Sequence, residues 1–376
     1  MQMKVLITDV DSRKGNDVVN MMQNLYRREV VLTSRRDTAF QMPLIYGRKV
    51  HRLRTLTYEF FREDLAVIES AHAPGSLIYL PVSEKVTRYF YQYLEEGKTT
   101  IRHLLPKAAV FNICADKGEF QTFCERAGLP VPKSYRAEDV DGLIRSFRPV
   151  LMKPKQGEGS VGIRYFNTVE SFQAPNFETH ILQEKVVSKE KVFGAFFLCK
   201  DGKVVNYYGH RRLRTFPESG GVTVFSKSYL NDELEQLGSD LLQALGYDGL
   251  AMVEFMFDEP SQSWRIIELN PRIWGSVLLS SVNNSHMLNH YIDLVEGQTW
   301  NEVAVDEEVY IRWFFPFELL GFFKGKLSLK QLFRPVSAPT CYINFSHSSL
   351  WRSLLFLVYF TVNIGSIRRM IKKLGT

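Results

Sequence analysis

The sequence predicts an α/β protein of two or three domains, and three observations lead to this prediction. Short apolar runs alternate with helical patterns from the N-terminus to about residue 110. A glycine-rich stretch then separates two strand-like runs, and further along two apolar runs flank a polar turn. The length of 376 residues, with 45 % hydrophobic and 23 % charged residues, is typical of a globular chain with ample core.

The first unit, residues 1–110, follows the order strand, helix, strand. We expect a helix from about 16 to 27 and strands at 4–8, 29–33 and 77–81. This order indicates a parallel sheet with helices packed on it. The first turn, at 9–15, lacks a G-x-G-x-x-G pattern, so we do not interpret it as a dinucleotide site.

A second unit begins near residue 115 with a helix over 116–127, which a Gly-Leu-Pro sequence ends. Strands at 150–153 and 161–166 flank the glycine-rich loop 154–160. Because this loop joins two strands, it is not a P-loop, in which the loop opens a helix. Its backbone N–H groups can still fold over phosphates, and the alternative is a plain hairpin turn.

A hairpin with two carboxylates is the most informative feature of the chain. Its arms are 250–257 and 264–270, and a simple antiparallel register places Glu254 opposite Glu268. Opposed side chains lie about 5 Å apart and like charges there repel, so the pair needs a counter-charge. A divalent cation is the natural candidate. Asn270 shares the face of Glu268, and oxygen ligands of this kind suit Mg²⁺.

The composition limits the classes of molecule that the chain is expected to bind. The net charge of +6 is mildly basic and compatible with phosphate ligands, an anionic membrane surface or nucleic acid. No zinc finger, RNA-recognition motif or long basic tail is visible, so we expect no nucleic-acid partner. The four cysteines are scattered, which favours reduced thiols in a cytoplasmic protein. The first apolar run is too short for a signal peptide.

The order of the motifs carries a family resemblance. Along the chain come Lys153-Pro154, the loop 157–162, Gln183-Glu184, Glu190, Glu254 and the string Glu268-Leu269-Asn270-Pro271-Arg272. This series resembles the ATP-grasp superfamily, and most closely its carbamoyl-phosphate-synthase-like and carboxylate–amine ligase members. The resemblance implies a pre-ATP-grasp domain at 1–110 and a two-lobed ATP-grasp domain at 111–300, with lobes of about 111–187 and 188–300. A C-terminal extension at 301–376 carries no family motif.

The resemblance also implies which residues bind ATP. Lys153 and Lys117 would contact phosphates, although a solvated helix lysine is the alternative for Lys117. The remaining nucleotide ligands would come from the glycine loop, from the strand and hinge that hold adenine, and from a ribose-binding acid: Gly157, Gly159, Ser160, Gly162, Gln183, Glu184, Val187 and Glu190. For Glu190, which Lys189 and Lys191 flank, a surface salt bridge competes with ribose binding.

Metal and substrate residues follow in the same way. Glu254, Glu268 and Asn270 match the metal ligands, in agreement with the hairpin argument. Arg272 matches an arginine near the γ-phosphate and the acyl phosphate. The segment 209–214, before a glycine turn at 217–221, resembles the strand that faces the acceptor site. Residues two apart on a strand share one face, and we expect the face with His210, Arg212 and Arg214 to point into the cleft. A solvated basic edge strand is the alternative.

The implied reaction uses ATP and Mg²⁺, with Mn²⁺ as an alternative ion. A substrate carboxylate becomes an acyl phosphate, and an amine then displaces phosphate to form an amide. Lys153 and Arg272 would carry the catalytic charge stabilisation, and the glycine loop would close over the site. The alternatives are an ATP-grasp small-molecule kinase and a nucleotide-binding membrane adaptor without turnover.

The sequence pattern of the C-terminal residues indicates an additional helix. Residues 350–367 are strongly apolar, and Arg368, Arg369, Lys372 and Lys373 follow them. The run is shorter than the about 20 residues that a spanning helix needs. One interpretation is an interfacial helix at the inner face of the membrane, which would serve a membrane-associated or cell-envelope substrate. The other is a buried helix that docks on the protein itself or on a second subunit, as in a homodimer.

Overall fold

The computed structural model describes most of the chain. The described residues are 3–35, 41–157, 162–190, 192–216, 222–301, 304–314, 318–323, 325, 327–333, 341–345 and 347–362. Several residues of the predicted sites fall outside these ranges, namely Gly159 and Ser160 of the glycine loop, the turn 217–221, and the tail cations Arg368, Arg369, Lys372 and Lys373.

The N-terminal domain contains the predicted parallel sheet, which is confirmed. Its strand order is β3-β2-β1-β4, and every pair is parallel. The strands are β1 (Lys4–Ile7), β2 (Val30–Ser34), β3 (Val50–Arg52) and β4 (Leu77–Leu80). The helices around it are α1 (Arg13–Asn20), α2 (Gln41–Tyr46), α3 (Tyr58–Ser70) and α4 (Glu84–Glu95). The strand order reverses between β1 and β4, where sheets of this kind leave a crevice at the carboxyl ends of the strands.

A small antiparallel sheet forms the next layer, with the order β5-β8-β6-β7. Its strands are β5 (Ser134–Tyr135), β6 (Val150–Pro154), β7 (Arg164–Phe166) and β8 (His180–Glu184). Helices α6 (Lys117–Arg126) and α7 (Val140–Arg145) accompany it, and the predicted helix at 116–127 corresponds to α6. The sheet has a core of its own, in which Val150, Met152 and Leu182 are buried together.

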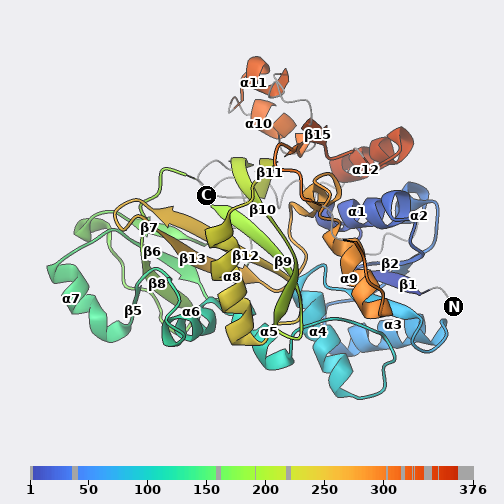
Figure 1. The fold of residues 1–376 in the computed structure, drawn as a ribbon, viewed down its shortest axis with the longest axis horizontal. Coiled ribbons are helices and arrows are strands. Elements are labelled where there is room, and N and C mark those ends of the chain that lie inside the picture. The colour runs from blue at the N-terminus through green and yellow to red at the C-terminus, as the bar shows by residue number, and fades with distance from the viewer. Residues whose placement is uncertain are drawn as a thin grey trace.

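A seven-stranded sheet follows, with the order β13-β12-β9-β10-β11-β14-β15. Its strands are β9 (Phe193–Lys200), β10 (Lys203–Phe216), β11 (Val222–Ser228), β12 (Gly249–Asp258), β13 (Ser263–Asn270), β14 (Tyr310–Arg312) and β15 (Cys341–Ile343). Helix α8 (Asp232–Leu245) covers one face (Figure 1). Gly238 of α8 lies so close to Phe197 that a Cβ there would be 2.1 Å from the ring, so only glycine permits this packing.

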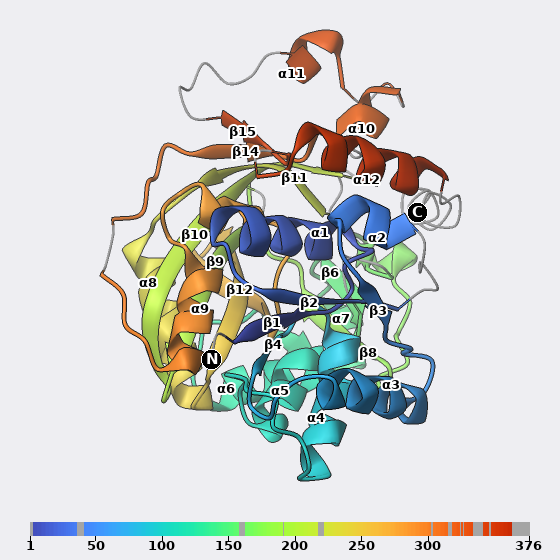
Figure 2. The same ribbon diagram turned by 90° about the vertical axis from the view of Figure 1, so that its right-hand side faces the viewer.

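The remaining helices connect the layers and form one end of the molecule. Helix α5 (Ala108–Ala115) leads into the small sheet, and α9 (Met287–Glu296) lies along the chain between β13 and β14 of the large sheet. Helices α10 (Leu319–Phe323), α11 (Leu329–Phe333) and α12 (Leu350–Val362) gather with β15 at one end, and α12 lies beside α1 and α2 (Figure 2). Among the described residues, no helix has the length and apolar character that crossing a membrane requires.

Candidate active site

A cavity of about 1080 Å³ lies where the N-terminal domain and the two further sheets meet. It is lined by ten of the residues predicted from the sequence: Lys117, Lys153, Gly157, Gln183, Glu184, Arg212, Glu254, Glu268, Asn270 and Arg272. The tertiary structure therefore brings together residues that are widely separated along the chain. Five other predicted residues are described but do not line the cavity: Gly162, Val187, Glu190, His210 and Arg214.

The hairpin of β12 and β13 places Glu254 opposite Glu268, so the predicted pairing is confirmed. The register then shifts: Phe255 pairs with Ile266, which leaves Ile267 as an extra residue on β13. The Ile267 carbonyl accepts a hydrogen bond from Lys153 Nζ at 3.3 Å. The bulge thus gives the buried lysine of β6 an acceptor next to the paired carboxylates.

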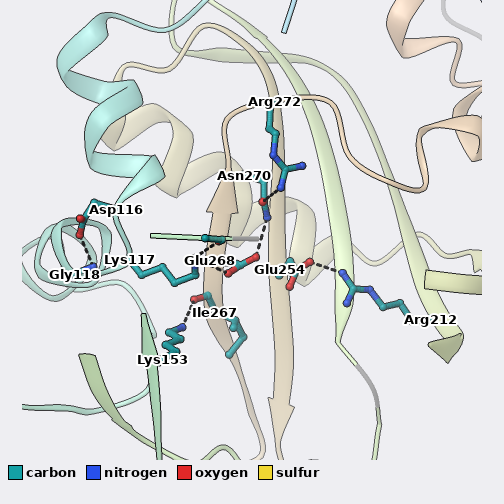
Figure 3. A network of polar contacts seen from close by, with 11 residues as sticks. Asp116, Lys117, Gly118, Lys153, Arg212, Glu254, Ile267, Glu268, Asn270 and Arg272 are labelled. Atoms are coloured by element: carbon teal, nitrogen blue, oxygen red, sulfur yellow. Dashed lines mark hydrogen bonds and ion pairs between the residues drawn. The ribbon is translucent and has the colours of Figure 1, made fainter. Parts of the chain in front are cut away.

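The protein itself supplies counter-charges for the two glutamates. Arg212 of β10 forms an ion pair with Glu254. On the other side, Lys117 Nζ lies 3.8 Å from Glu268 Oε2, and Asn270 Nδ2 donates to Glu268 Oε1 at 3.0 Å. Figure 3 shows the lysines and Arg212 approaching the hairpin from opposite sides. The repulsion that the sequence predicts is therefore balanced by side chains from other elements.

The pKa values of the site reflect this arrangement. Burial raises the pKa of Glu254, and the nearby Glu268 charge adds to that rise against the opposing effect of Arg212. Burial would also raise the pKa of Glu268, but Lys117 and Lys153, with smaller contributions from Asn270 and Arg272, hold that pKa below its usual range. Burial lowers the pKa of Lys153 to about 8, against the opposing pull of Glu268. A buried lysine of this kind gains most from an anionic ligand.

Asn270 and Arg272 extend the network beyond Glu268. Arg272 donates to Asn270 Oδ1 at 2.8 Å and to the Ile273 carbonyl at 3.0 Å. An amide oxygen has two lone pairs, so Asn270 Oδ1 retains one acceptor position beside that hydrogen bond. Within the described ranges, no group of three His, Cys, Asp or Glu residues is arranged to hold a metal. Two carboxylates with an amide oxygen nevertheless fit Mg²⁺, which keeps several water or phosphate ligands.

Lys117 links the glycine loop to the hairpin. It is the first residue of α6, whose N-cap Asp116 accepts from the Gly118 and Glu119 amides at 2.9 and 3.1 Å. Its Nζ donates to the Gly157 carbonyl at 2.9 Å, and only 18 % of its side chain is exposed. The alternative of a solvated helix lysine is therefore wrong.

The predicted adenine segment is placed only in part as expected. Gln183 is buried and donates to Gln121 Oε1 at 2.5 Å, while Glu184 is partly exposed with Arg148 3.8 Å away. Both line the cavity. Val187, in contrast, is exposed, and its neighbour Val186 lines the cavity instead. The sequence does not distinguish the two adjacent valines of this segment, and in the structure Val187 is the one that faces away from the cavity.

Glu190 lies outside the cavity lining and forms a bidentate ion pair with Arg211, with distances of 2.6 and 2.7 Å to Nη2. Of its two flanking lysines, Lys189 lies 3.4 Å from Glu259. The structure therefore places Glu190 in the surface salt bridge that was the alternative to ribose binding, although its partner is an arginine of β10. Lys191 lies outside the described residues.

The expectation that His210, Arg212 and Arg214 share one face of the cleft is wrong. His210 is fully buried, its ring edge meets Phe196 at 4.9 Å between centroids, and burial holds its pKa well below the usual range. A bulge after Arg212 disturbs the alternation, and Arg214 pairs with the buried Glu318. The alternative of a solvated edge strand is also wrong, since β10 lies between β9 and β11. Of the three, Arg212 lines the cavity.

The N-terminal domain contributes a wall that the sequence did not predict. Asp9, which follows β1, accepts a hydrogen bond from Ser83 Oγ, which follows β4, at 2.5 Å, and it forms an ion pair with Arg35. All three residues line the cavity, together with Lys14 and Lys85. This wall lies where the strand order reverses, so the rule for open parallel sheets pointed to Asp9 and Ser83. The turn itself lacks the glycine pattern of a dinucleotide site, so its local sequence carries no sign of this wall.

Asp9 has a left-handed backbone conformation, with φ of 56°, which is uncommon outside glycine. Its carbonyl accepts from the Ser12 amide at 2.9 Å and from Ser12 Oγ at 2.7 Å. A Cβ on Gly15 would lie 2.2 Å from the same carbonyl oxygen, so the turn requires glycine there. The first turn is thus built to hold the Asp9 carboxylate at the cavity.

Comparisons with known proteins agree with this architecture. Residues 114–276 match the family model described as an ATP-grasp domain. Two curated relatives are the mitochondrial methylcrotonoyl-CoA carboxylase subunits alpha of Glycine max and Arabidopsis thaliana, at 27 % identity over 202 residues and 24 % over 208. These matches cover 48 and 49 % of this chain, and the chain spans only 27 and 28 % of the relatives' own length.

Solved structures with a similar fold include biotin carboxylase from Campylobacter jejuni, with a TM-score of 0.65, 15 % identity, and coverage of 82 % of this chain and 74 % of that one. The biotin carboxylase domain of Hydrogenobacter thermophilus 2-oxoglutarate carboxylase has a TM-score of 0.64 and 16 % identity, and the match covers 82 % of this chain and 74 % of that one. N5-carboxyaminoimidazole ribonucleotide synthetase from Thermotoga maritima has a TM-score of 0.54 and 12 % identity, and the match covers 81 % of this chain and 78 % of that one. At these identities the likeness is one of fold.

Proposed function

We propose that this chain, whose residues 114–276 are an ATP-grasp domain, is an ATP- and Mg²⁺-dependent ligase that joins a carboxylate to an amine. One observation carries the proposal: a single cavity brings two lysines and two arginines around a pair of opposed glutamates, namely Lys117, Lys153, Arg212 and Arg272 around Glu254 and Glu268. Such a site provides for polyphosphate charge and for its counter-ion at once.

The phosphates of ATP would lie against Lys153, Lys117 and Arg272. Lys153 is buried beside Glu268, and Lys117 bridges the loop carbonyl of Gly157 and the same carboxylate. Mg²⁺ held by Glu254, Glu268 and Asn270 would supply neutralisation of phosphate charge. The guanidinium of Arg272, oriented by Asn270, can bind an oxyanion with its remaining donors.

The reaction requires no covalent nucleophile from the protein. A carboxylate oxygen of the substrate attacks the γ-phosphorus, the bond to the bridging oxygen breaks, and ADP leaves. The amine nitrogen then attacks the acyl carbon, phosphate leaves, and the nitrogen loses a proton as the amide forms. Lys153 and Arg272 stabilise the charge that moves in both steps, so positioning and electrostatics are the main contributions of the chain.

The carboxylate would be an acidic compound bound on the N-terminal side of the cavity. Arg35, Lys14 and Lys85 line that wall, and Asp9 is held there by Arg35 and Ser83. Bicarbonate is the smallest candidate, because the related Hydrogenobacter thermophilus structure holds a bicarbonate anion together with magnesium ADP. The amine partner would then approach from the side of Arg212.

Two other functions use the same cavity. A small-molecule kinase would stop after phosphoryl transfer and release a stable phosphorylated product without needing an amine. A nucleotide-binding adaptor at a membrane would bind ATP without turnover. We favour the ligase, because burying two opposed carboxylates and several cations is costly and a passive adaptor has no need of the pair.

ADP release tests these functions directly. The purified chain is screened with carboxylates, including bicarbonate, in the presence and absence of amines, Mg²⁺ and lipid extract. The ligase requires ADP release that depends on both a carboxylate and an amine. Amine-independent release with a stable phosphorylated product would identify the kinase, and ATP binding with no release under any combination would identify the adaptor.

A further inference from the structure

The charge of the chain is divided unevenly along its length. Residues 319–376 contain nine Lys and Arg residues and no Asp or Glu, whereas residues 1–318 contain 38 basic and 41 acidic residues. The net charge of +6 therefore comes entirely from this C-terminal basic segment, residues 319–376. A long segment that contains cations and no acids favours an anionic partner.

The C-terminal basic segment also exposes large apolar side chains. Fourteen are exposed in the described part of the chain, and six of them lie in this segment: Phe323 (73 %), Leu329 (60 %), Ile343 (44 %), Trp351 (69 %), Leu354 (46 %) and Val358 (53 %). The elements that carry them, α10, α11, β15 and α12, lie at the same end of the molecule in both views (Figures 1 and 2). Apolar side chains concentrated at one end mark an interaction surface.

Helix α12 has two apolar faces. Ser353, Phe356 and Tyr359 are buried, and the two aromatic residues join the core of the N-terminal domain. Trp351, Leu354 and Val358 are exposed and lie on the opposite side, because successive residues turn by about 100°. The helix is therefore docked on the protein by one face while the other face remains uncovered.

Arg352 fixes this docking. Its Nη1 donates to Asn20 Oδ1 at 3.0 Å, and its guanidinium lies 5.8 Å from the centroid of the Tyr46 ring. With one face held by α1 and α2, the rotation of α12 is determined, so Trp351, Leu354 and Val358 face outward as a set. The two sequence-based interpretations, docking on the protein and an interfacial helix, are therefore compatible in one helix.

We propose that the C-terminal basic segment binds an anionic phospholipid surface, with Trp351, Leu354 and Val358 entering the headgroup boundary. An exposed apolar stripe, a tryptophan beside it and an excess of cations without acids are the combination that such a surface recognises. Two copies of a segment with nine cations and no acid repel each other, which disfavours a symmetric contact through it. The proposal does not depend on the ATP-dependent reaction.

Vesicle binding by the full chain tests the proposal. Vesicles of phosphatidylcholine, alone or with about 30 % phosphatidylserine, are mixed with the protein at low and high salt. Co-sedimentation reports binding, and a change in tryptophan emission that is absent in the variant lacking Trp351 reports the environment of that residue. One variant combines Trp351→Ser, Leu354→Ser and Val358→Ser, and a second replaces Arg368, Arg369, Lys372 and Lys373 with Gln. The matched control replaces exposed apolar residues elsewhere, with Val67→Ser, Ile144→Ser and Val169→Ser.

We expect binding to anionic vesicles at low salt, a blue shift of the tryptophan emission, and a loss of affinity of about tenfold in high salt and in either variant. The control should bind as the unmodified chain does, and all variants should keep the same melting temperature and ATP turnover. Equal binding to neutral vesicles, or unchanged binding by the serine variant, would overturn the proposal. The proposal would also be overturned if the unmodified chain did not bind vesicles but formed a dimer, and if the serine variant were monomeric.

Discussion

Glu254 and Glu268 stand directly opposite each other in the β12–β13 hairpin, yet each carboxylate is paired with different cations. Arg212 from β10 binds Glu254, while Lys117 from the start of α6 lies 3.8 Å from Glu268. The two halves of the pair therefore respond differently to substitution. The Glu254 half depends on an arginine, whereas two lysines and the Asn270 amide converge on the Glu268 half.

Glu268→Gln should abolish Mg²⁺-dependent ATP turnover, because an amide replaces an anionic ligand. Its melting temperature should fall slightly at neutral pH, since the lowered pKa of Glu268 means that the fold stabilises the ionised form. Like-charge repulsion between the two glutamates alone would raise the melting temperature of this variant, but the lysines beside Glu268 reverse the sign. Turnover assays and thermal melts check both points, with the exposed Glu178→Gln as control. Undiminished turnover would eliminate the two-carboxylate metal site.

Arg212→Met should destabilise the metal-free protein by about 3 kcal/mol, because Glu254 becomes a buried carboxylate without its cation. Added Mg²⁺ should then raise the melting temperature more in this variant than in the unmodified protein, since the ion replaces the lost charge. Arg211→Met is the matched control, because its partner Glu190 lies outside the cavity. An equal Mg²⁺-dependent shift in all three proteins would mean that the ion does not contact Glu254.

Lys153→Met keeps the aliphatic stem and removes the ammonium. We expect the transition state for ATP turnover to lose about 3 kcal/mol, roughly a hundredfold in kcat/KM, as a charged contact in a desolvated site is lost. Lys203→Met changes an exposed lysine of β10 and should have no effect. Unchanged ATP kinetics in the first variant would indicate that the loop 154–160 is a plain turn.

The pH dependence of ATP use should report Lys153. Its pKa of about 8 means that the ammonium form, which is the form proposed to bind phosphate, predominates below that pH and is lost above it. We therefore expect kcat/KM for ATP to fall as the pH rises through about 8. Lys153→Arg should remove this alkaline limb, because a guanidinium stays charged. A limb that persists in the arginine variant belongs to another group.

Gly15→Ala should destabilise the protein by about 2 kcal/mol or more and weaken use of the carboxylate substrate, because the new Cβ meets the Asp9 carbonyl at 2.2 Å. Gly142→Ala, in α7 with nothing within 4 Å of the added atom, is the control and should be neutral or stabilising. Thermal melts separate the two. A Gly15→Ala protein as stable as the unmodified one would show that the first turn adapts.

Local patterns predicted a large part of the architecture. The parallel sheet follows from apolar runs alternating with helices, and the Glu254–Glu268 pairing follows from arm length and turn position. Both depend on neighbours close in sequence, where periodicity and turn chemistry dominate. The bulge at Ile267 escaped this reasoning, because an extra residue in one strand leaves no sign in the apolar pattern.

The sequence by itself determined that two glutamates face each other, that a basic strand precedes them, and that the tail is apolar and then cationic. Only the tertiary structure decided which cations reach the glutamates, that His210 is buried while Arg212 lines the cavity, and that α12 leaves Trp351 outside. These outcomes depend on contacts between residues far apart along the chain, such as Arg212 with Glu254 across 42 positions and Lys153 with Ile267 across 114. Long-range packing selects them, and the alternation of residues along a single strand carries no information about the elements that pack against it.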